Sequence, residues 1–428
     1  MKNNVDIRDD TDIRDDIDIR DDTDIRGNID IRENTDNKDS VGSTDYKRNM
    51  FDADNLGIYV HIPFCVSKCV YCDFLSSPQT DEVKARYINA LCQSIRADET
   101  NERRKLPVNS VFFGGGTPSL IKTELLLSIL DSIKDRYNLT EDAEITIEAN
   151  PGTVNLEKLK AYRDAGINRI SFGIQSAIDS ELKMLGRVHN FTEAKEAVYM
   201  AKEVGFDNIN ADIIMAIPGA DKDKFKYTLD SILKLDLPHI SAYSLIIEEG
   251  TKLYDSLDTF PKLPDEDSER EMYYMLQDCL TANGYRQYEI SNFAREGYES
   301  VHNRKYWQML PYIGYGIAAA SFYDGRRYSV TADLDKFISN PLASIENVEL
   351  LDKKDYYEEF VFLGLRMNEG ISREEFQKRF GLNISDIYGK VIESNLKKGL
   401  LLNEDDRLKL SRRGIDLANT VMSDFILT

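Results

Sequence analysis

The sequence predicts an α/β protein in which an incomplete (β/α) barrel of about six parallel strands is followed by a small α+β, winged-helix-like C-terminal domain. Three observations carry this prediction. Short apolar runs alternate with amphipathic helical stretches between residues 56 and 245. After Pro264 the pattern loosens into short segments rich in Tyr and Gly. From Asp355 onward it becomes helical again, around a single hairpin.

The barrel prediction depends on strands and helices that alternate along the chain. Strand–helix–strand units place their strands parallel, and six units are too few for a closed eightfold barrel. Functional side chains of such sheets collect at the C-terminal ends of the strands. The expected strands are 57–62, 110–113, 144–148, 169–173, 208–214 and 239–245. The expected helices between them are 82–96, 122–137, 155–165, 192–204 and 222–235.

The pattern of apolar and polar residues divides the rest of the chain into further segments. A helix is expected at 268–283, followed by short strands and loops, and the last part combines three helices with a hairpin at 400–410 and a final helix at 414–425. A packing role suits this last part better than DNA binding, because the protein is acidic. We therefore expect a tail at 1–48, a core at 49–284, a linking β segment at 285–350 and a C-terminal domain at 351–428.

The first 48 residues form a decaying hexapeptide repeat that starts at Asp6 with Asp-Ile-Arg-Asp-Asp-Thr. Isoleucines alternate along it, but its charges are dense and no aromatic residue precedes Tyr46. Such a segment buries too little apolar surface to offset the entropy lost on ordering. The sequence predicts a disordered acidic tail, and an arm that self-associates or binds cations is the alternative.

Charge and composition argue against several classes of protein. The formal net charge of −21 opposes a nucleic-acid scaffold, which needs a basic face. The charged N-terminus lacks the apolar core of a signal peptide. Apolar runs also fall far short of the ~20 residues of a membrane span. We expect a soluble cytoplasmic protein that binds no nucleic acid, while peripheral membrane contact and homodimer formation stay open.

Three of the five cysteines lie within eight residues in a C-x3-C-x2-C pattern, at Cys65, Cys69 and Cys72. Each thiolate can bind a different iron of a [4Fe–4S] cubane, and the fourth iron then stays open for the amino and carboxylate groups of S-adenosylmethionine (SAM). Zinc is the alternative, with His61 as a fourth ligand, although structural zinc commonly uses paired C-x2-C units. Cys92 and Cys279 lie on expected helices and are predicted to be structural.

A glycine run follows the expected strand at 110–113, one strand–helix unit after the cysteine loop. Four polar residues lie in or after later strands. Gly114–Gly116 lets a ligand approach the backbone closely, although a glycine run alone is a weak signal. A charged residue on an apolar strand is costly unless it is paired, so Glu148 and Asp212 are expected to bind a partner. A structural hydrogen bond is the alternative for each of the four, which are Glu148, Gln175, Arg187 and Asp212.

Together these motifs resemble the HemN/HemW branch of the radical SAM superfamily, from about Leu56 to the C-terminus. The resemblance rests on Tyr-Val-His-Ile-Pro-Phe-Cys at 59–65 and Gly-Gly-Gly-Thr-Pro-Ser at 114–119. One loop departs from it, since Ala216 and Ala220 stand where the family usually has Gly and Gln. The resemblance implies SAM contacts from Tyr59, Tyr71, Gly115, Gly116, Thr117, Glu148, Gln175, Arg187 and Asp212.

The branch holds two functions, and two features of this chain favour one of them. Oxygen-independent coproporphyrinogen III dehydrogenases, which decarboxylate propionates by radical chemistry, carry a further cysteine where this chain has Phe74. Heme chaperones, which deliver heme to respiratory-chain proteins, carry His-Asn-x-x-Tyr-Trp, present here at 302–307. The resemblance therefore favours a heme chaperone, with the dehydrogenase or another radical SAM activity as the alternatives.

The chaperone pattern implies a heme site. An imidazole is a common axial ligand of heme iron, and flat aromatic rings cover a macrocycle well. The implied heme contacts are His302, Asn303, Tyr306 and Trp307. The implied cofactors are a [4Fe–4S] cluster, SAM and heme, and the implied protein partners are a heme acceptor and an electron donor. No catalytic residue follows from the sequence, and whether the chain is an enzyme stays open.

Overall fold

The computed structural model describes residues 55–98 and 105–427. The predicted tail at 1–48 lies outside these residues. Six parallel strands form the centre of the fold, as the sequence predicted, and they pair in chain order. Their bounds are β1 (Leu56–Ile62), β2 (Pro107–Gly115), β3 (Asn138–Ala149), β4 (Arg169–Gln175), β5 (Asn208–Met215) and β6 (His239–Ser244).

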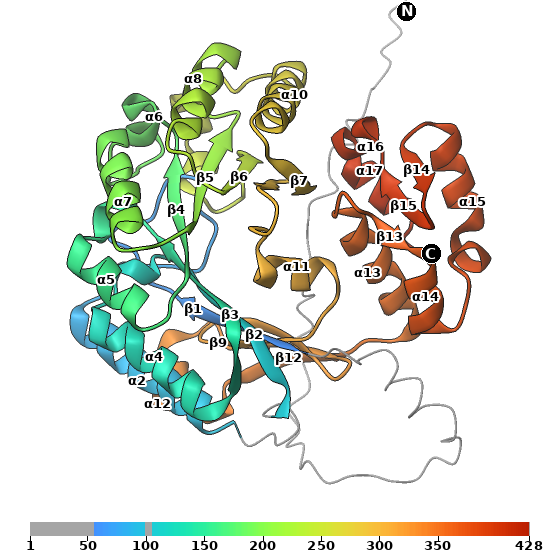
Figure 1. The fold of residues 1–428 in the computed structure, drawn as a ribbon. Helices are drawn as coiled ribbons and strands as arrows, with labels where there is room; N and C mark the ends of the chain where they lie inside the picture. The colour runs from blue at the N-terminus through green and yellow to red at the C-terminus, as the bar shows by residue number, and fades with distance from the viewer. Residues whose placement is uncertain (1–54, 99–104, 428) are drawn as a thin grey trace, which may run out of the picture.

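Helices cover the outer face of the curved sheet (Figure 1). Their apolar stripes pack on the strands, as when Tyr87, Ile88 and Leu91 of the first helix become buried. Side-chain caps set several helix starts, for example Thr80, whose hydroxyl accepts from the amide of Val83. These helices are α2 (Asp81–Arg96), α4 (Thr123–Arg136), α5 (Leu156–Asp164), α6 (Asp179–Met184), α7 (Phe191–Glu203), α8 (Lys222–Leu233), α10 (Glu266–Ala282) and α12 (Leu334–Ser339).

The segment expected at 285–350 extends the same sheet at both edges. The hairpin of β7 (Arg286–Glu289) and β8 (Asn292–Ala294) pairs antiparallel with β6. At the other edge β9 (Tyr312–Tyr315) lies parallel to β1, and β10 (Ala320–Tyr323), β11 (Arg326–Val330) and β12 (Ile345–Leu350) follow it. The predicted division of the chain at residues 48, 284 and 350 stays a proposal.

Short helices connect these strands. The one that matters most for the site is α11 (Val301–Trp307), which lies between the sheet and the C-terminal helices (Figure 1). Among the described residues no helix is both long and apolar enough to cross a membrane. The remaining short elements are η1 (Pro118–Leu120), η2 (Pro151–Thr153), α9 (Lys252–Asp255), η3 (Leu257–Thr259) and η4 (Pro341–Ala343).

The C-terminal part has its own apolar core, built around Phe360, Phe376 and Tyr388. Five helices accompany a three-stranded antiparallel sheet, which agrees with the predicted α+β character. The elements are α13 (Lys353–Leu365), β13 (Ile371–Ser372), α14 (Arg373–Phe380), α15 (Ile384–Lys397), β14 (Leu401–Glu404), β15 (Arg407–Leu410), α16 (Arg412–Asp416) and α17 (Ala418–Ser423).

The single helix expected at 414–425 is wrong, because the chain turns at Leu417 and forms α16 and α17 instead. Residues on the two sides of this turn contact different parts of the protein. Asp416 on α16 forms an ion pair of 2.8 Å with Arg270 on α10. Beyond the turn, Val421 and Met422 reach the C-terminal core.

Candidate cluster and cofactor site

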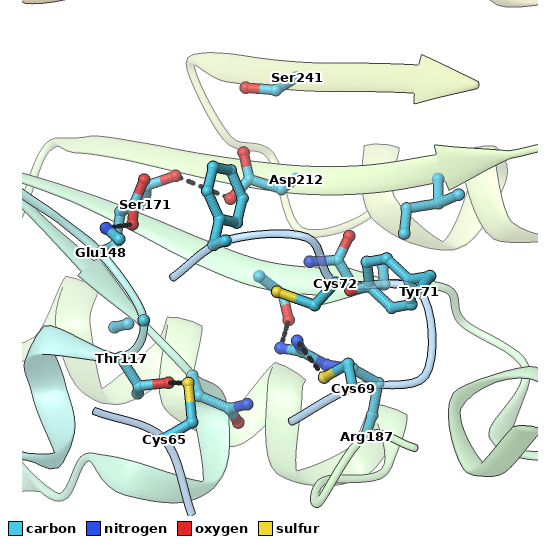
Figure 2. Close-up of a pocket in the computed structure, with 18 of the residues that line it drawn as sticks. Cys65, Cys69, Tyr71, Cys72, Thr117, Glu148, Ser171, Arg187, Asp212 and Ser241 are labelled. Atoms are coloured by element: carbon cyan, nitrogen blue, oxygen red, sulfur yellow. Dashed lines mark hydrogen bonds between the residues drawn. The ribbon is translucent and has the colours of Figure 1, made fainter. Parts of the chain in front are cut away.

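The predicted cluster ligands and most of the predicted SAM contacts meet in one cavity of about 610 Å³ at the C-terminal ends of the parallel strands (Figure 2). The three cysteines of the loop after β1 lie on its wall. Eight of the nine predicted SAM contacts also line it, namely Tyr71, Gly115, Gly116, Thr117, Glu148, Gln175, Arg187 and Asp212. Residues from β2, β3, β4 and β5 and from the loops after β1, β2 and α6 thus share one cavity.

Backbone hydrogen bonds hold the cysteine loop against three other parts of the chain. Cys65 donates its amide to the carbonyl of Ser77 at 3.3 Å, closing the loop on itself. Val70 donates to the carbonyl of Leu185 at 3.2 Å and accepts from the amide of Leu253 at 2.8 Å. The loop is therefore tied to the end of α6 and to α9, which limits how far its thiols can move.

Each of two cysteine sulfurs has a polar neighbour. Cys65 Sγ lies 3.4 Å from Thr117 Oγ1, and Arg187 Nη1 donates to Cys69 Sγ at 3.5 Å (Figure 2). Hydrogen bonds of this kind stabilise thiolate charge. Among the described residues no three side chains are grouped so as to hold a single metal ion. Ligands of a cubane bind different irons, so they do not have to meet at one point.

His61 belongs to the support of the loop. Its Nε2 lies 3.0 Å from the carbonyl oxygen of Leu75, and its Nδ1 lies 3.0 Å from the hydroxyl of Tyr59. Burial lowers the pKa of this imidazole. Both ring nitrogens are therefore occupied, so this arrangement does not supply the fourth ligand that the zinc alternative required.

The glycine run is necessary for packing as well as for ligand access. Gly115 has φ +105°, a backbone conformation that residues with a side chain rarely adopt. A Cβ on Gly116 would lie 2.8–2.9 Å from backbone atoms of Ile62 and Phe64. The run thus lets the end of β2 pass directly beneath the start of the cysteine loop.

Two carboxylates line the cavity, Glu148 from β3 and Asp212 from β5, the two strands that flank β4. Glu148 Oε2 accepts from the amide of Gly115 at 3.0 Å. Burial, followed by the charge of Asp212, raises the pKa of Glu148 to about 8. Asp212 accepts from Ser171 Oγ at 3.0 Å and from the hydroxyl of Tyr243 at 2.8 Å. These bonds from neutral donors are the structural hydrogen bonds named as the alternative for Asp212, and its role as a SAM contact stays a prediction.

Several buried polar atoms of residues that line the cavity have no hydrogen-bond partner among the described residues, and Oε1 of Gln175 and Nε of Arg187 are two of them. Gln175 also has φ +71°, a strained conformation for a residue with a side chain. Orphaned buried polar atoms and local strain are costly unless a ligand uses them. The cavity therefore fits a polar cofactor that reaches the end of β4 and the segment after α6.

Comparisons with known proteins agree with this geometry. Residues 59–232 match the model of the radical SAM superfamily, and residues 351–417 match the HemN C-terminal domain. The heme chaperone HemW of Lactococcus lactis is 35% identical over 86% of this chain and 97% of its own length. HemW of Escherichia coli is 36% identical over 87% of this chain and 98% of its own length. The chain belongs to the HemW family of radical SAM proteins.

Solved structures support the fold of this HemW family member. The coproporphyrinogen III oxidase HemN from Escherichia coli superposes with a TM-score of 0.77, covering 90% of this chain and 93% of that one. At 21% identity this likeness shows the fold alone. Radical SAM membership gives the cavity its cofactors, a [4Fe–4S] cluster and SAM. When bound, such a cluster supplies one-electron chemistry at its irons.

The remaining predicted residues lie elsewhere in the HemW-family chain. Tyr59 does not line the cavity, because its ring stacks on Phe112 beneath it. His302 is buried, with Nδ1 at 3.0 Å from Ser110 Oγ and Nε2 at 2.9 Å from the hydroxyl of Tyr306. Burial, followed by the charges of two neighbouring cations, lowers the pKa of His302 to about 3. Its predicted role as a heme contact stays a prediction.

Helix α11 divides the rest of its motif between two cavities. Asn303 lines the cluster cavity, whereas Trp307 lines a second cavity of about 580 Å³ against the C-terminal helices. Tyr306 lines neither cavity, and its ring packs edge-on against Tyr312 with centroids 4.6 Å apart. The four residues of the motif are therefore close in sequence but do not surround one space.

The polar floor around Asp212 was missed by the sequence prediction. Asn210 donates to Asp212 Oδ1 at 2.7 Å, to Ser171 Oγ at 2.7 Å and to Ser241 Oγ at 2.9 Å. The sequence does contain a signal for this polar cluster, because Asn210 and Asp212 are two residues apart on one strand and therefore share a face of the sheet. Ser241 and Tyr243 repeat the same spacing on the next strand.

Proposed function

We propose that this chain is a heme chaperone, which binds heme and delivers it to heme proteins such as respiratory-chain enzymes. The names of its relatives support the proposal, since HemW proteins from several bacteria match nearly the whole chain at 30–36% identity. Phe74 also supports it, because a coproporphyrinogen dehydrogenase carries cysteine at that place and this ring is 65% exposed beside the cluster loop.

The observation that carries the proposal is the position of α11. This helix bears His302, Asn303, Tyr306 and Trp307, and it separates the cluster cavity from the second cavity. A ligand bound on its far side is thus one helix away from the cluster. We propose that the cluster and SAM act on that helix, that the protein works in the cytoplasm, and that an electron donor and a heme acceptor are its partners.

One anaerobic experiment tests the proposal. Protein reconstituted with iron and sulfide is divided into two samples, one titrated with hemin and one given SAM, a reductant and coproporphyrinogen. We expect stoichiometric heme binding and no decarboxylation. Heme transfer is then measured as the activity recovered by an apo heme protein mixed with the loaded chain. Decarboxylation by a chain that binds no heme would replace the chaperone with the dehydrogenase.

A matched pair of variants links the binding to α11. Trp307→Ala removes the aromatic face at the end of the helix, whereas Cys279→Ala alters α10 away from both cavities. We expect the first variant to bind hemin more weakly while keeping its cluster, because apolar contact with the macrocycle contributes to binding. The second variant should bind as the wild type does.

A further inference from the structure

The last strand of the large sheet leaves an apolar edge uncovered. β12 pairs with β11 on one side, and no described strand pairs with its other side. Ile345, Val348 and Leu350 on this strand are 56%, 61% and 68% exposed. An exposed edge that combines unpaired backbone groups with apolar side chains is a template for one more strand.

A bulge places these three side chains on one face of the sheet. At the bulge β12 has one residue more than β11, and Asn347 adopts φ +53° there. The register on its two sides pairs Leu350 with Arg326 and Ile345 with Val330. Because Arg326 and Val330 share a face of β11, all three apolar side chains of β12 share that face as well. Val330 belongs to the buried core, so the cover of this face ends one strand before the edge.

The opposite face of β12 carries negative charge. Glu346 and Glu349 occupy it, since they pair with Ser329 and Arg327 of β11. Glu346 also forms an ion pair with Lys336 of α12. A strand that adds to this edge therefore needs apolar side chains on one face and cations on the other.

One segment of the N-terminal tail has this pattern. It consists of residues 25–32, in which Ile25, Gly27, Ile29 and Ile31 alternate with Arg26, Asn28, Asp30 and Arg32. The three preceding repeats have Asp-Asp where this one has Gly-Asn. With two arginines and one aspartate, the segment has a formal charge of +1. The charge density that predicts disorder for the tail is thus lower here than in the preceding repeats.

The chain before β1 is long enough to reach this edge. The strands β1, β9, β10, β11 and β12 are neighbours in that order, and their directions place Leu350 at the end of the sheet where β1 begins. An added strand lies about 24 Å from β1, at roughly 4.8 Å per strand. Residues 33–54 can span about 70 Å when extended. A tether of this length gives an effective concentration in the millimolar range.

We propose that residues 25–32 add to β12 as a further strand of the sheet. The isoleucines of the segment pack beside the apolar side chains of β12, and its arginines face Glu346 and Glu349 on the other side. Backbone hydrogen bonds to the free side of β12 supply affinity, and the alternation of side chains supplies specificity. The tail then covers an edge that could pair with other chains. This pairing does not depend on the proposed heme function.

Hydrogen–deuterium exchange of the full chain, with its cluster reconstituted, tests the pairing at peptides that cover residues 345–350. Ile29→Asp with Ile31→Asp introduces charge into the apolar face of the segment. Ile7→Asp with Ile13→Asp makes the same change in the first two repeats and is the matched control. None of the four positions lies in the cluster cavity or in the apolar cores, so iron content should stay equal.

We expect slow exchange at 345–350 in the wild type and in the control. The Ile29 and Ile31 double variant should exchange there about tenfold faster, because the outer amides of β12 lose their partners. Equal exchange in the wild type and this double variant would overturn the pairing. Protection that rises with protein concentration and survives the change at Ile29 and Ile31 would assign the edge to a second copy of the chain, and would overturn it too.

A charge exchange tests the predicted facing of the two strands. Arg26→Glu with Arg32→Glu should also speed exchange at 345–350, since four like charges then share one face. Adding Glu349→Lys to this variant should restore part of the protection. Faster exchange that Glu349→Lys does not reduce would contradict the proposed contact between the arginines and this face of β12.

Discussion

The imidazole of His61 lies where a side chain on residue 115 would have to go. A Cβ built on Gly115 would come within 2.5 Å of His61 Nδ1, closer than real contacts allow. His61 in turn supports the cysteine loop through the carbonyl of Leu75. The end of β2 and the cluster loop are thus coupled through one ring.

This coupling makes a prediction about Gly115→Ala. The new methyl group should displace His61, so the variant should lose iron as well as SAM affinity, instead of SAM affinity alone. The added His61→Ala change opens space for the methyl group, and iron content should recover in part, since the strain at φ +105° remains. Iron analysis of the two single variants and the double variant measures this. If the iron loss of the double variant equals the sum of the losses of the two single variants, the two residues act independently.

A second prediction concerns the cluster ligands. Replacing Cys65, Cys69 or Cys72 by Ala should abolish the [4Fe–4S] cluster, because each thiolate holds a different iron of the cubane. Reconstituted wild type should contain about four irons per chain. Cys92→Ala and Cys279→Ala provide controls, since both residues lie on helices outside the cavity. A full cluster spectrum from the Cys69 variant would contradict the ligand assignment.

A third prediction follows from the raised pKa of Glu148. With its pKa at about 8, this carboxyl is protonated at neutral pH in the SAM-free protein. SAM carries a sulfonium cation, so it favours the ionised form and its binding should release this proton below pH 8. We expect SAM affinity to rise by about tenfold per pH unit at most as pH increases toward 8.

The matched variant for this measurement is Glu148→Gln, which keeps the shape of the side chain but cannot ionise. Its SAM affinity should change less between pH 6.5 and pH 8.5, as measured by equilibrium dialysis of protein with equal iron content. An identical pH dependence in both proteins would assign the linkage to another group.

A fourth prediction uses the buried His302. Its pKa of about 3 lies below the roughly 6.5 of an unfolded chain, so between these values only the unfolded chain takes up the proton. The stability that this group contributes is therefore lost as pH falls from about 6.5 to 3. His302→Gln should cost about 1–3 kcal/mol at pH 7.5, because it disturbs hydrogen bonds to Ser110 and Tyr306.

The cost of His302→Gln should shrink by about 2 kcal/mol at pH 5, since the variant lacks the histidine that charges on unfolding. Urea unfolding of both proteins at the two pH values measures the difference, and the other three histidines are common to both. A cost that is equal at pH 5 and pH 7.5 would mean that His302 is protonated in the folded state.

Several parts of this protein could be predicted from local sequence. The spacing of Cys65, Cys69 and Cys72 within one loop identifies a cubane site because all three ligands are near neighbours in the chain. The six parallel strands follow from apolar periodicity, which depends on residues a few positions apart. Eight of the nine predicted SAM contacts line the cavity, and most of them end or follow a parallel strand, because the C-terminal ends of such strands meet at one edge.

Tertiary structure alone decided the features that join distant segments. Strand β9 lies beside β1 although more than 200 residues separate them, and His302 bonds to Ser110 across 192 positions. Local pattern carries no information on such partners, so only the structure shows that the helix with the motif at 302–307 lines two separate cavities. The chemistry available to a residue depends on its type and on its neighbours in the sequence. The groups that it contacts depend on which distant segments of the chain pack against it.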